Sequence, residues 1–180
     1  ASATLKDDRE IVLEAVKQNG NALSYASARL KDDRKMVMEA VKNVKNGSLI
    51  GIPEEYKNDV DFMIEAVEHN WHLIKGVTKE MKRNPKYEMK INPKYPKFVM
   101  AAVKTNWEAI KFAGTVMNMD EWQKIGIEAI KKNWEAIIHL QDLKDNERFY
   151  LEAVEIDPRI MEHAQTRPKG DKNVVMKAVK

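Results

Sequence analysis

Residues 11–16 read Ile-Val-Leu-Glu-Ala-Val, and the tripeptide Glu-Ala-Val at their end, or a close variant, recurs along the 180-residue chain. The central residue of the tripeptide is alanine in all seven copies, which are Ala15, Ala40, Ala66, Ala102, Ala129, Ala153 and Ala178. Neighbouring alanines are 24 to 27 residues apart, except for a spacing of 36 residues between Ala66 and Ala102. A period of about 25 residues is typical of helical repeat proteins.

Apolar residues surround each alanine with the spacing of a helix. Four residues before the alanines the chain carries Ile11, Met36, Phe62, Phe98, Ile125, Phe149 and Val174, and one residue after them it always carries Val or Ile. This stripe predicts a helix of about 11 residues in each unit, which we call helix A. The small alanine lets a neighbouring helix approach closely. We expect N-caps at Asp7, Asp32, Asn58 and Asp145, with Asp7 and Glu10 forming a capping box.

A second, shorter helix B is expected after each helix A. An Asn or Asp stands near the end of each of the first six A helices, at Asn19, Asn46, Asn70, Asn106, Asn133 and Asp157. These residues favour N-cap positions, and Pro158 after Asp157 suits the first position of a helix. Examples of the expected B helices are residues 22–30, 108–113 and 135–140.

The pattern predicts an all-α solenoid of about seven units of roughly 25 residues, each with a long helix A and a short helix B. We expect one array over residues 1–180, with units near 5–30, 31–55, 56–78, 92–117, 118–142, 143–168 and 169–180. The long spacing places an insertion at residues 79–95, between the third and fourth units.

Residues 5–27 read Leu-Lys-Asp-Asp-Arg-Glu-Ile-Val-Leu-Glu-Ala-Val-Lys-Gln-Asn-Gly-Asn-Ala-Leu-Ser-Tyr-Ala-Ser. This segment closely resembles the tandem unit of the domain of unknown function four-one-one-six family, which is found in arrays in bacterial and protist proteins. The resemblance is strong up to Val41 and weaker beyond it, where Trp71, Trp107 and Trp134 replace a glycine. It implies an α-helical array and brings no catalytic residue with it.

Composition and motifs point away from catalysis. The chain has no cysteine, which excludes disulfides, thiolate metal sites and cysteine nucleophiles. Its seven glycines form no phosphate-binding or nucleophile-elbow motif. Glu65, His69 and His72 lie close in sequence but lack the further ligands of a zinc site. We therefore expect no enzymatic activity, no metal and no cofactor.

No apolar stretch reaches the roughly 18 residues that a membrane span needs, and no signal-like segment is visible at Ala1. The sequence thus indicates a soluble protein without a membrane span. It leaves the cellular compartment open.

Two groups of residues are candidates for binding a partner. Residues 75–97 contain eight basic and two acidic residues, a net charge of +6, whereas the whole chain carries +3. Within or beside the insertion, the candidates are Lys82, Arg83, Lys86, Tyr87, Lys90, Lys94 and Tyr95. Trp71, Trp107 and Trp134 occupy one position of the repeat, where tryptophan serves as an anchor at interfaces or packs on the preceding unit.

These observations favour a non-enzymatic scaffold for protein–protein interaction. One alternative is a structural spacer, or a segment of a larger protein such as a bacterial effector or a protist protein. Another is binding of nucleic acid or of an acidic protein through the basic loop of residues 75–97. Nucleic acid is the weaker of these alternatives because the predicted helices show no basic face.

Overall fold

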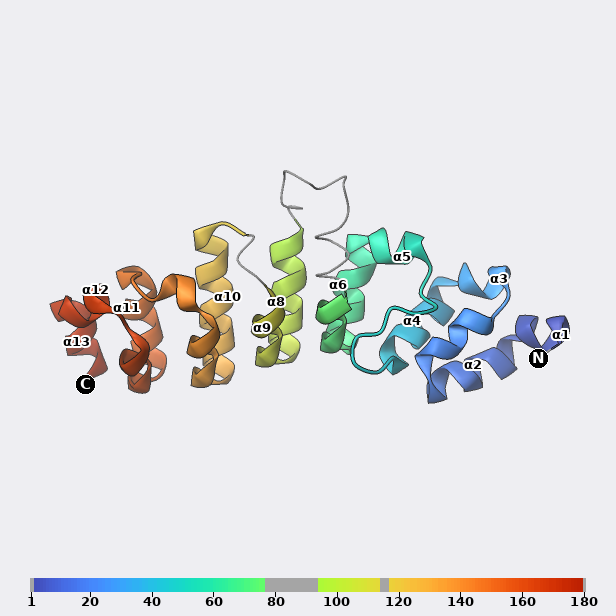
Figure 1. Cartoon of the computed structure of the whole chain (residues 1–180), viewed down its shortest axis with the longest axis horizontal. Coiled ribbons are helices and arrows are strands. Elements are labelled where there is room, and N and C mark those ends of the chain that lie inside the picture. The colour runs from blue at the N-terminus through green and yellow to red at the C-terminus, as the bar shows by residue number, and fades with distance from the viewer. Residues whose placement is uncertain (1, 77–93, 114–116, 180) are drawn as a thin grey trace. The chain divides into compact units, whose positions relative to one another are not determined.

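The computed structural model describes residues 2–76, 94–113 and 117–179. These residues form helices and no strand, as the sequence predicts (Figure 1). The chain divides into two compact units, Ala1–Thr105 and Asn106–Lys180. The single array of seven solenoid units stays a prediction. No helix in the described ranges is long and apolar enough to span a membrane.

Longer helices follow one another in each unit. In Ala1–Thr105 they are α2 (Arg9–Gln18), α4 (Arg34–Asn43), α6 (Val60–His69) and α8 (Tyr95–Thr105), and each packs against the next. In Asn106–Lys180 they are α10 (Met119–Lys132), α11 (Glu147–Ile156) and α13 (Lys172–Ala178), again packed in chain order. All of these helices fall where a helix A is expected.

Short helices connect the longer ones. In the first unit they are α1 (Ala3–Asp7), α3 (Ala28–Lys31), α5 (Glu54–Asn58) and the 3₁₀ helices η1 (Gly20–Tyr25) and η2 (Trp71–Leu73). In the second unit they are α9 (Ile110–Ala113), α12 (Thr166–Gly170) and the 3₁₀ helices η4 (Trp107–Ala109), η5 (Trp134–His139), η6 (Gln141–Leu143) and η7 (Pro158–His163).

The core contains the residues that the period places there. The tripeptide alanines Ala40, Ala66, Ala102, Ala129 and Ala153 are all fully buried. The apolar residues four positions before them are at most 1 % exposed. A buried alanine leaves the backbone of its helix close to its neighbours, as expected from its size.

The predicted N-caps are wrong by one residue. Asp8, Asp33 and Asp59 cap α2, α4 and α6, and each side chain accepts two backbone N–H groups of the first turn. In the same way Asn146 caps α11, so the prediction at Asp145 is also displaced. At α2 and α6 the reason is a short helix that occupies the predicted cap position, since α1 ends at Asp7 and α5 ends at Asn58, directly before the true caps.

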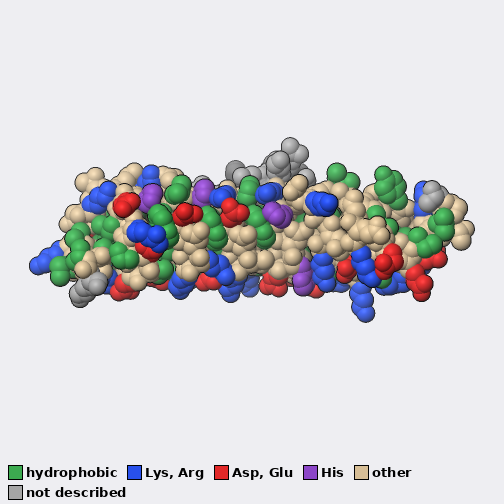
Figure 2. Space-filling view, turned by 90° about the horizontal axis from the view of Figure 1, so that it is seen from below, with side chains coloured by type: hydrophobic (Ala, Val, Ile, Leu, Met, Phe, Trp, Pro, Cys, Tyr) green, Lys and Arg blue, Asp and Glu red, His purple; other side chains and the backbone are tan. Residues whose placement is uncertain are grey.

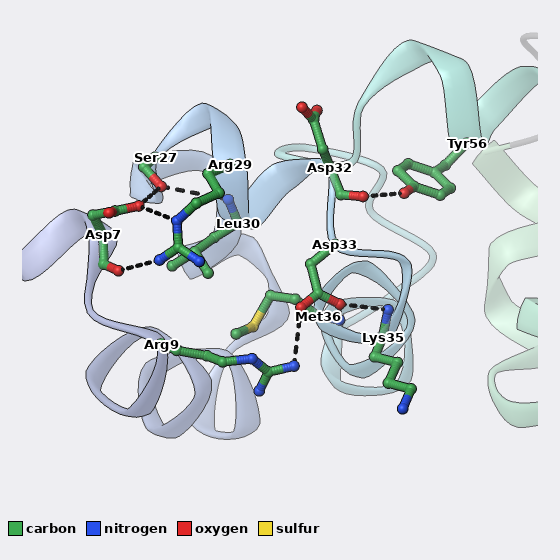
Figure 3. Close-up of polar contacts among 10 residues, drawn as sticks. All are labelled: Asp7, Arg9, Ser27, Arg29, Leu30, Asp32, Asp33, Lys35, Met36 and Tyr56. Atoms are coloured by element: carbon green, nitrogen blue, oxygen red, sulfur yellow. Dashed lines mark hydrogen bonds and ion pairs between the residues drawn. The ribbon is translucent and has the colours of Figure 1, made fainter.

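The predicted capping box of Asp7 and Glu10 does not form, because Asp8 accepts the hydrogen bond from the Glu10 backbone N–H. Asp7 instead accepts hydrogen bonds from Ser27 Oγ and from Arg29 Nε, the latter at 3.1 Å, and so ties α1 to α3 (Figure 3). These bonds, with that of Ser27 first, lower the pKa of Asp7.

Further polar contacts in Figure 3 join neighbouring helices of the first unit. Arg9 donates to the Asp33 carboxylate, the N-cap of α4, at 3.0 Å. Tyr56 donates its hydroxyl hydrogen to the Asp32 carbonyl oxygen at 2.8 Å. The first contact links α2 to the start of α4, and the second links α5 to the end of α3.

Helix B differs from the prediction in its geometry. Residues 22–30 do not form one helix: η1 ends at Tyr25, and Ser27 then caps the separate helix α3. In the second predicted unit Asn46 and Gly47 have positive φ and form a turn, so Asn46 caps no helix. A Cβ on Gly47 would lie 1.9 Å from the His72 carbonyl oxygen, and the close approach therefore requires glycine. The predicted helices 108–113 and 135–140 correspond to η4 with α9 and to η5.

The boundary of the insertion also needs correction. Tyr95 is the first residue of α8, so this helix begins inside the predicted segment 79–95. Lys82, Arg83, Lys86, Tyr87 and Lys90 lie outside the described residues.

Candidate functional site

The short helices η4, η5 and η7 of the second unit begin at polar caps. Asn106, Asn133 and Asp157 accept hydrogen bonds from the backbone N–H groups of Glu108, Glu135 and Arg159, at 2.9, 2.9 and 3.0 Å. At the end of α10, the Asn133 backbone N–H also bonds to the Ala129 carbonyl oxygen. An Asn or Asp thus stands between the end of each of these long helices and the start of the next short one, and this cap fixes the position of the residue that follows.

That following residue is tryptophan in η4 and η5, and also in η2 of the first unit. All three indole rings are half-buried, and each has a cation over its face. Lys75 lies 5.5 Å from the Trp71 ring centre, Lys111 lies 5.1 Å from that of Trp107, and Arg159 lies 4.4 Å from that of Trp134. The structure therefore places the three predicted tryptophans at equivalent places and adds a cation to each.

Acidic partners hold two of these cations in place. Lys111 forms an ion pair with Glu108 at 2.6 Å, and Arg159 forms one with Asp157 at 2.5 Å. The hydrogen bond from Arg159 lowers the pKa of the Asp157 carboxyl, and the same bond raises the pKa of Arg159. A planar guanidinium fixed by a carboxylate over an indole is a preorganised contact surface.

Two histidines lie beside the tryptophan–cation pairs. The His163 ring centre is 6.1 Å from that of Trp134. Partial burial lowers the pKa of His139, and the nearby ammonium group of Lys111 lowers it further. The neutral imidazole of His139 is therefore favoured at neutral pH.

An exposed isoleucine lies on the same short helix as Trp134. Ile138 on η5 is 48 % exposed, and η5 contacts both α9 and η7. We call the surface formed by these three neighbouring segments the tryptophan face, and we define it by Trp107, Lys111, Trp134, Ile138, His139 and Arg159.

Sequence reasoning identified only the tryptophans of this face. Lys111 follows Trp107 by four residues, as Lys75 follows Trp71, and this i,i+4 spacing was a signal for both cations. Arg159 comes from a separate segment 25 residues after Trp134, so no local spacing reveals its contact.

The candidate residues at the end of the insertion are placed differently. Lys94 forms an ion pair with Asp61 at 2.5 Å and so links α8 to α6. Tyr95 is only 4 % exposed, and its ring packs against Phe98 with centres 6.3 Å apart. Burial raises the pKa of Tyr95. Tyr95 is thus a core residue in this structure, and its prediction as a surface contact is wrong.

Glu65, His69 and His72 form no metal-binding cluster, and the described ranges hold no group of three or more His, Asp or Glu side chains suited to a metal ion. Glu65 instead accepts a hydrogen bond from Arg34 at 2.8 Å.

Comparison with known proteins gives a family for the first part of the chain. The model of the family described as Domain of unknown function (DUF4116) matches three overlapping segments, residues 1–31, 8–51 and 33–82. No significant match was found among curated proteins or among solved structures. The resemblance seen in residues 5–27 is confirmed by this match, which covers residues 1–82 of the 180-residue chain.

Proposed function

We propose that the chain is a helical-repeat array of about seven units that acts as a non-enzymatic scaffold and binds a protein partner through the tryptophan face. The observation that carries this proposal is the half-buried Trp134 ring under Arg159, on the same short helix as the exposed side chain of Ile138. Aromatic rings, arginine and a central apolar side chain are the residue types that dominate binding energy at protein interfaces.

The charges of the tryptophan face favour a protein partner. Lys111 and Arg159 are both ion-paired within the face, and Glu135 beside them is exposed. Basic and acidic side chains are interspersed on the side of the molecule seen in Figure 2. A surface that carries both positive and negative charges suits a protein partner, whose interface rim is also polar and charged, better than it suits the uniformly negative phosphate backbone of a nucleic acid.

The proposal is tested by affinity capture from the source lysate with two matched variants. Ile138→Glu places a charge on the exposed part of η5 in the tryptophan face. Met119→Glu makes the same change at a side chain that is also 48 % exposed but lies in the first turn of α10. A partner that is recovered with wild type and Met119→Glu but lost with Ile138→Glu supports the proposal. Equal recovery with all three proteins refutes it.

Binding through the basic loop of residues 75–97 is the second candidate, and its +6 charge is the observation in its favour. At the ends of the loop, Lys75 lies over Trp71 and Lys94 pairs with Asp61. Most of its other charges lie outside the described residues. A gel shift at low salt that disappears as salt is raised supports nucleic-acid binding, and absence of any shift at low salt excludes it. Deletion of residues 79–93, which leaves Lys94 and the buried Tyr95 in place, separates this route from the tryptophan face.

A further inference from the structure

Two large apolar side chains of the first unit are exposed outside the tryptophan face. Tyr25, the last residue of η1, is 73 % exposed, and Ile50, in the loop between α4 and α5, is 67 % exposed. Each stands ten residues after a tripeptide alanine, Ala15 or Ala40, so the two occupy the same position of the repeat. The repeat therefore presents an apolar side chain to solvent twice in succession.

The loop that carries Ile50 packs directly on η1. A Cβ on Gly51 would lie only 2.8 Å from the Ser24 backbone nitrogen and 3.1 Å from its Cα, so the two backbones touch at these residues. Ile50 and Tyr25 are the chain neighbours of this contact, each one residue away from it. The contact joins the two segments into one surface.

Hydrogen bonds hold the same two segments together. The Ser48 hydroxyl donates to Asn21 Oδ1 at 3.2 Å and accepts the Ile50 backbone N–H at 3.3 Å. The Ser24 hydroxyl donates to the Asn21 carbonyl oxygen at 2.8 Å. These polar side chains thus form hydrogen bonds within the surface, and they fix the loop on η1 before any partner arrives.

The exposure of Ile50 is not caused by a lack of neighbouring chain. Its loop packs on η1, which precedes it, and also on the segment that follows α6, because a Cβ on Gly76 would lie 3.1 Å from the Leu49 side chain. Ile50 is exposed although its loop has packed neighbours from both the preceding and the following part of the chain. The repeat packing itself therefore leaves this position open.

No charged side chain occurs in the two segments that form this surface. Residues 19–28 and residues 46–53 contain no Asp, Glu, Lys or Arg, in a chain of which 33 % is charged. The corresponding segments of the second unit, residues 106–113, 133–140 and 157–164, each contain at least one charged residue. We call residues 19–28 and 46–53 the uncharged patch. Charged residues are likewise depleted in the core of protein interfaces.

We propose that the uncharged patch binds a segment of a partner protein that is itself apolar and uncharged. The Tyr25 ring and the Ile50 side chain supply the apolar contact, and the Tyr25 hydroxyl supplies a hydrogen bond to the partner's backbone. The bonds among Asn21, Ser24 and Ser48 order the patch in advance, which lowers the entropy cost of binding.

The charges of the patch decide between kinds of partner. A charged partner segment would lose its water without gaining an opposite charge, so an uncharged segment is the complementary one. Nucleic acid and anionic membranes are bound through basic side chains, which the patch lacks. This surface is separate from the tryptophan face, and the inference does not depend on the proposed function.

Selection from a random peptide library displayed on phage tests the proposal with the intact chain. Peptides that bind wild type are counter-selected against Ile50→Glu and then titrated, as synthetic peptides, by fluorescence anisotropy. We expect peptides rich in aromatic and aliphatic residues. Their affinity should fall at least about tenfold in Tyr25→Glu and in Ile50→Glu, because the new carboxylate is buried without a partner. Met119→Glu, at a side chain that is 48 % exposed on α10, is the matched control and should bind them like wild type.

Ile138→Glu separates this inference from the proposed function, because it alters the tryptophan face and should leave these peptides bound. Failure to recover any peptide that distinguishes wild type from Ile50→Glu overturns the proposal. A requirement for acidic or basic residues in the selected peptides overturns it as well. Cosedimentation with phosphatidylcholine vesicles that is lost in Ile50→Glu also overturns it, since that result assigns the patch to a membrane surface. Circular dichroism confirms that the variants are folded.

Discussion

Asn70 stands at the end of α6 and bonds to the end of the preceding long helix, α4. We expect removal of its side chain to destabilise the first unit strongly. Its side chain is 9 % exposed, and its Nδ2 group donates to the Val41 and Val44 carbonyl oxygens at 3.0 and 2.9 Å. Both acceptors lie at the end of α4, on residues that are at most 5 % exposed. In Asn70→Ala these carbonyls lose a partner in a site that water does not readily reach.

The magnitude follows from the two bonds. Leaving a buried acceptor unpaired costs about 1–3 kcal/mol, so two acceptors give about 3 kcal/mol in total. Asn19→Ala is the matched control, because Asn19 has the equivalent place at the end of α2 but is exposed, and its side chain accepts a hydrogen bond from the Asn21 backbone N–H. Loss of such an exposed cap costs about 1 kcal/mol.

Urea denaturation followed by circular dichroism measures both variants against wild type. The expected result is a midpoint for Asn70→Ala that lies well below that of Asn19→Ala, at a similar denaturant slope. If Asn70→Ala unfolds at the same urea concentration as Asn19→Ala, the two buried hydrogen bonds contribute no more than a surface cap, and the reasoning is refuted.

Three further predictions concern packing and pH. Ala129→Leu should lower stability by about 1–3 kcal/mol in thermal denaturation because Ala129 is fully buried, whereas Ala15→Leu at the exposed equivalent should change it little. The lowered pKa of Asp7 means that its contacts with Ser27 and Arg29 stabilise the chain above the usual aspartate pKa and are lost as the pH falls through the lowered value, so Asp7→Asn should weaken this acid dependence of the melting temperature. Burial raises the pKa of Tyr150 to about 12, so spectrophotometric titration should show this phenol ionising well above the ordinary tyrosine pKa, and the folded chain should lose stability as the pH rises above that ordinary value.

The positions of the long helices were predictable because burial imposes their period. Ala66 and Phe62, for example, are both fully buried, and their spacing of four residues is visible in the sequence alone. The caps were harder to place, because two acidic residues stand together at Asp7 and Asp8 and either can accept N–H groups in principle. The short helix α1 ends at Asp7 and decides the choice in favour of Asp8.

The candidate site was predictable only where a residue type recurs. Trp107 and Trp134 stand at one position of the period, but the exposure of Ile138 depends on how η5 lies between α9 and η7. Arg159 reaches Trp134 across two short helices that are far apart in sequence. Such contacts depend on tertiary packing, which a local pattern does not contain. The burial of Tyr95 has the same cause, because α8 begins at that residue and turns its ring into the core.

Site-specific photo-crosslinking tests most directly whether the tryptophan face binds a protein. A photoreactive phenylalanine analogue is placed at Ile138 in one protein and at Met119 in another, since both side chains have the same exposure. The account predicts a discrete protein adduct in the source lysate from position 138 and none from position 119. Equal adducts from both positions, or an adduct from position 119 alone, would contradict it.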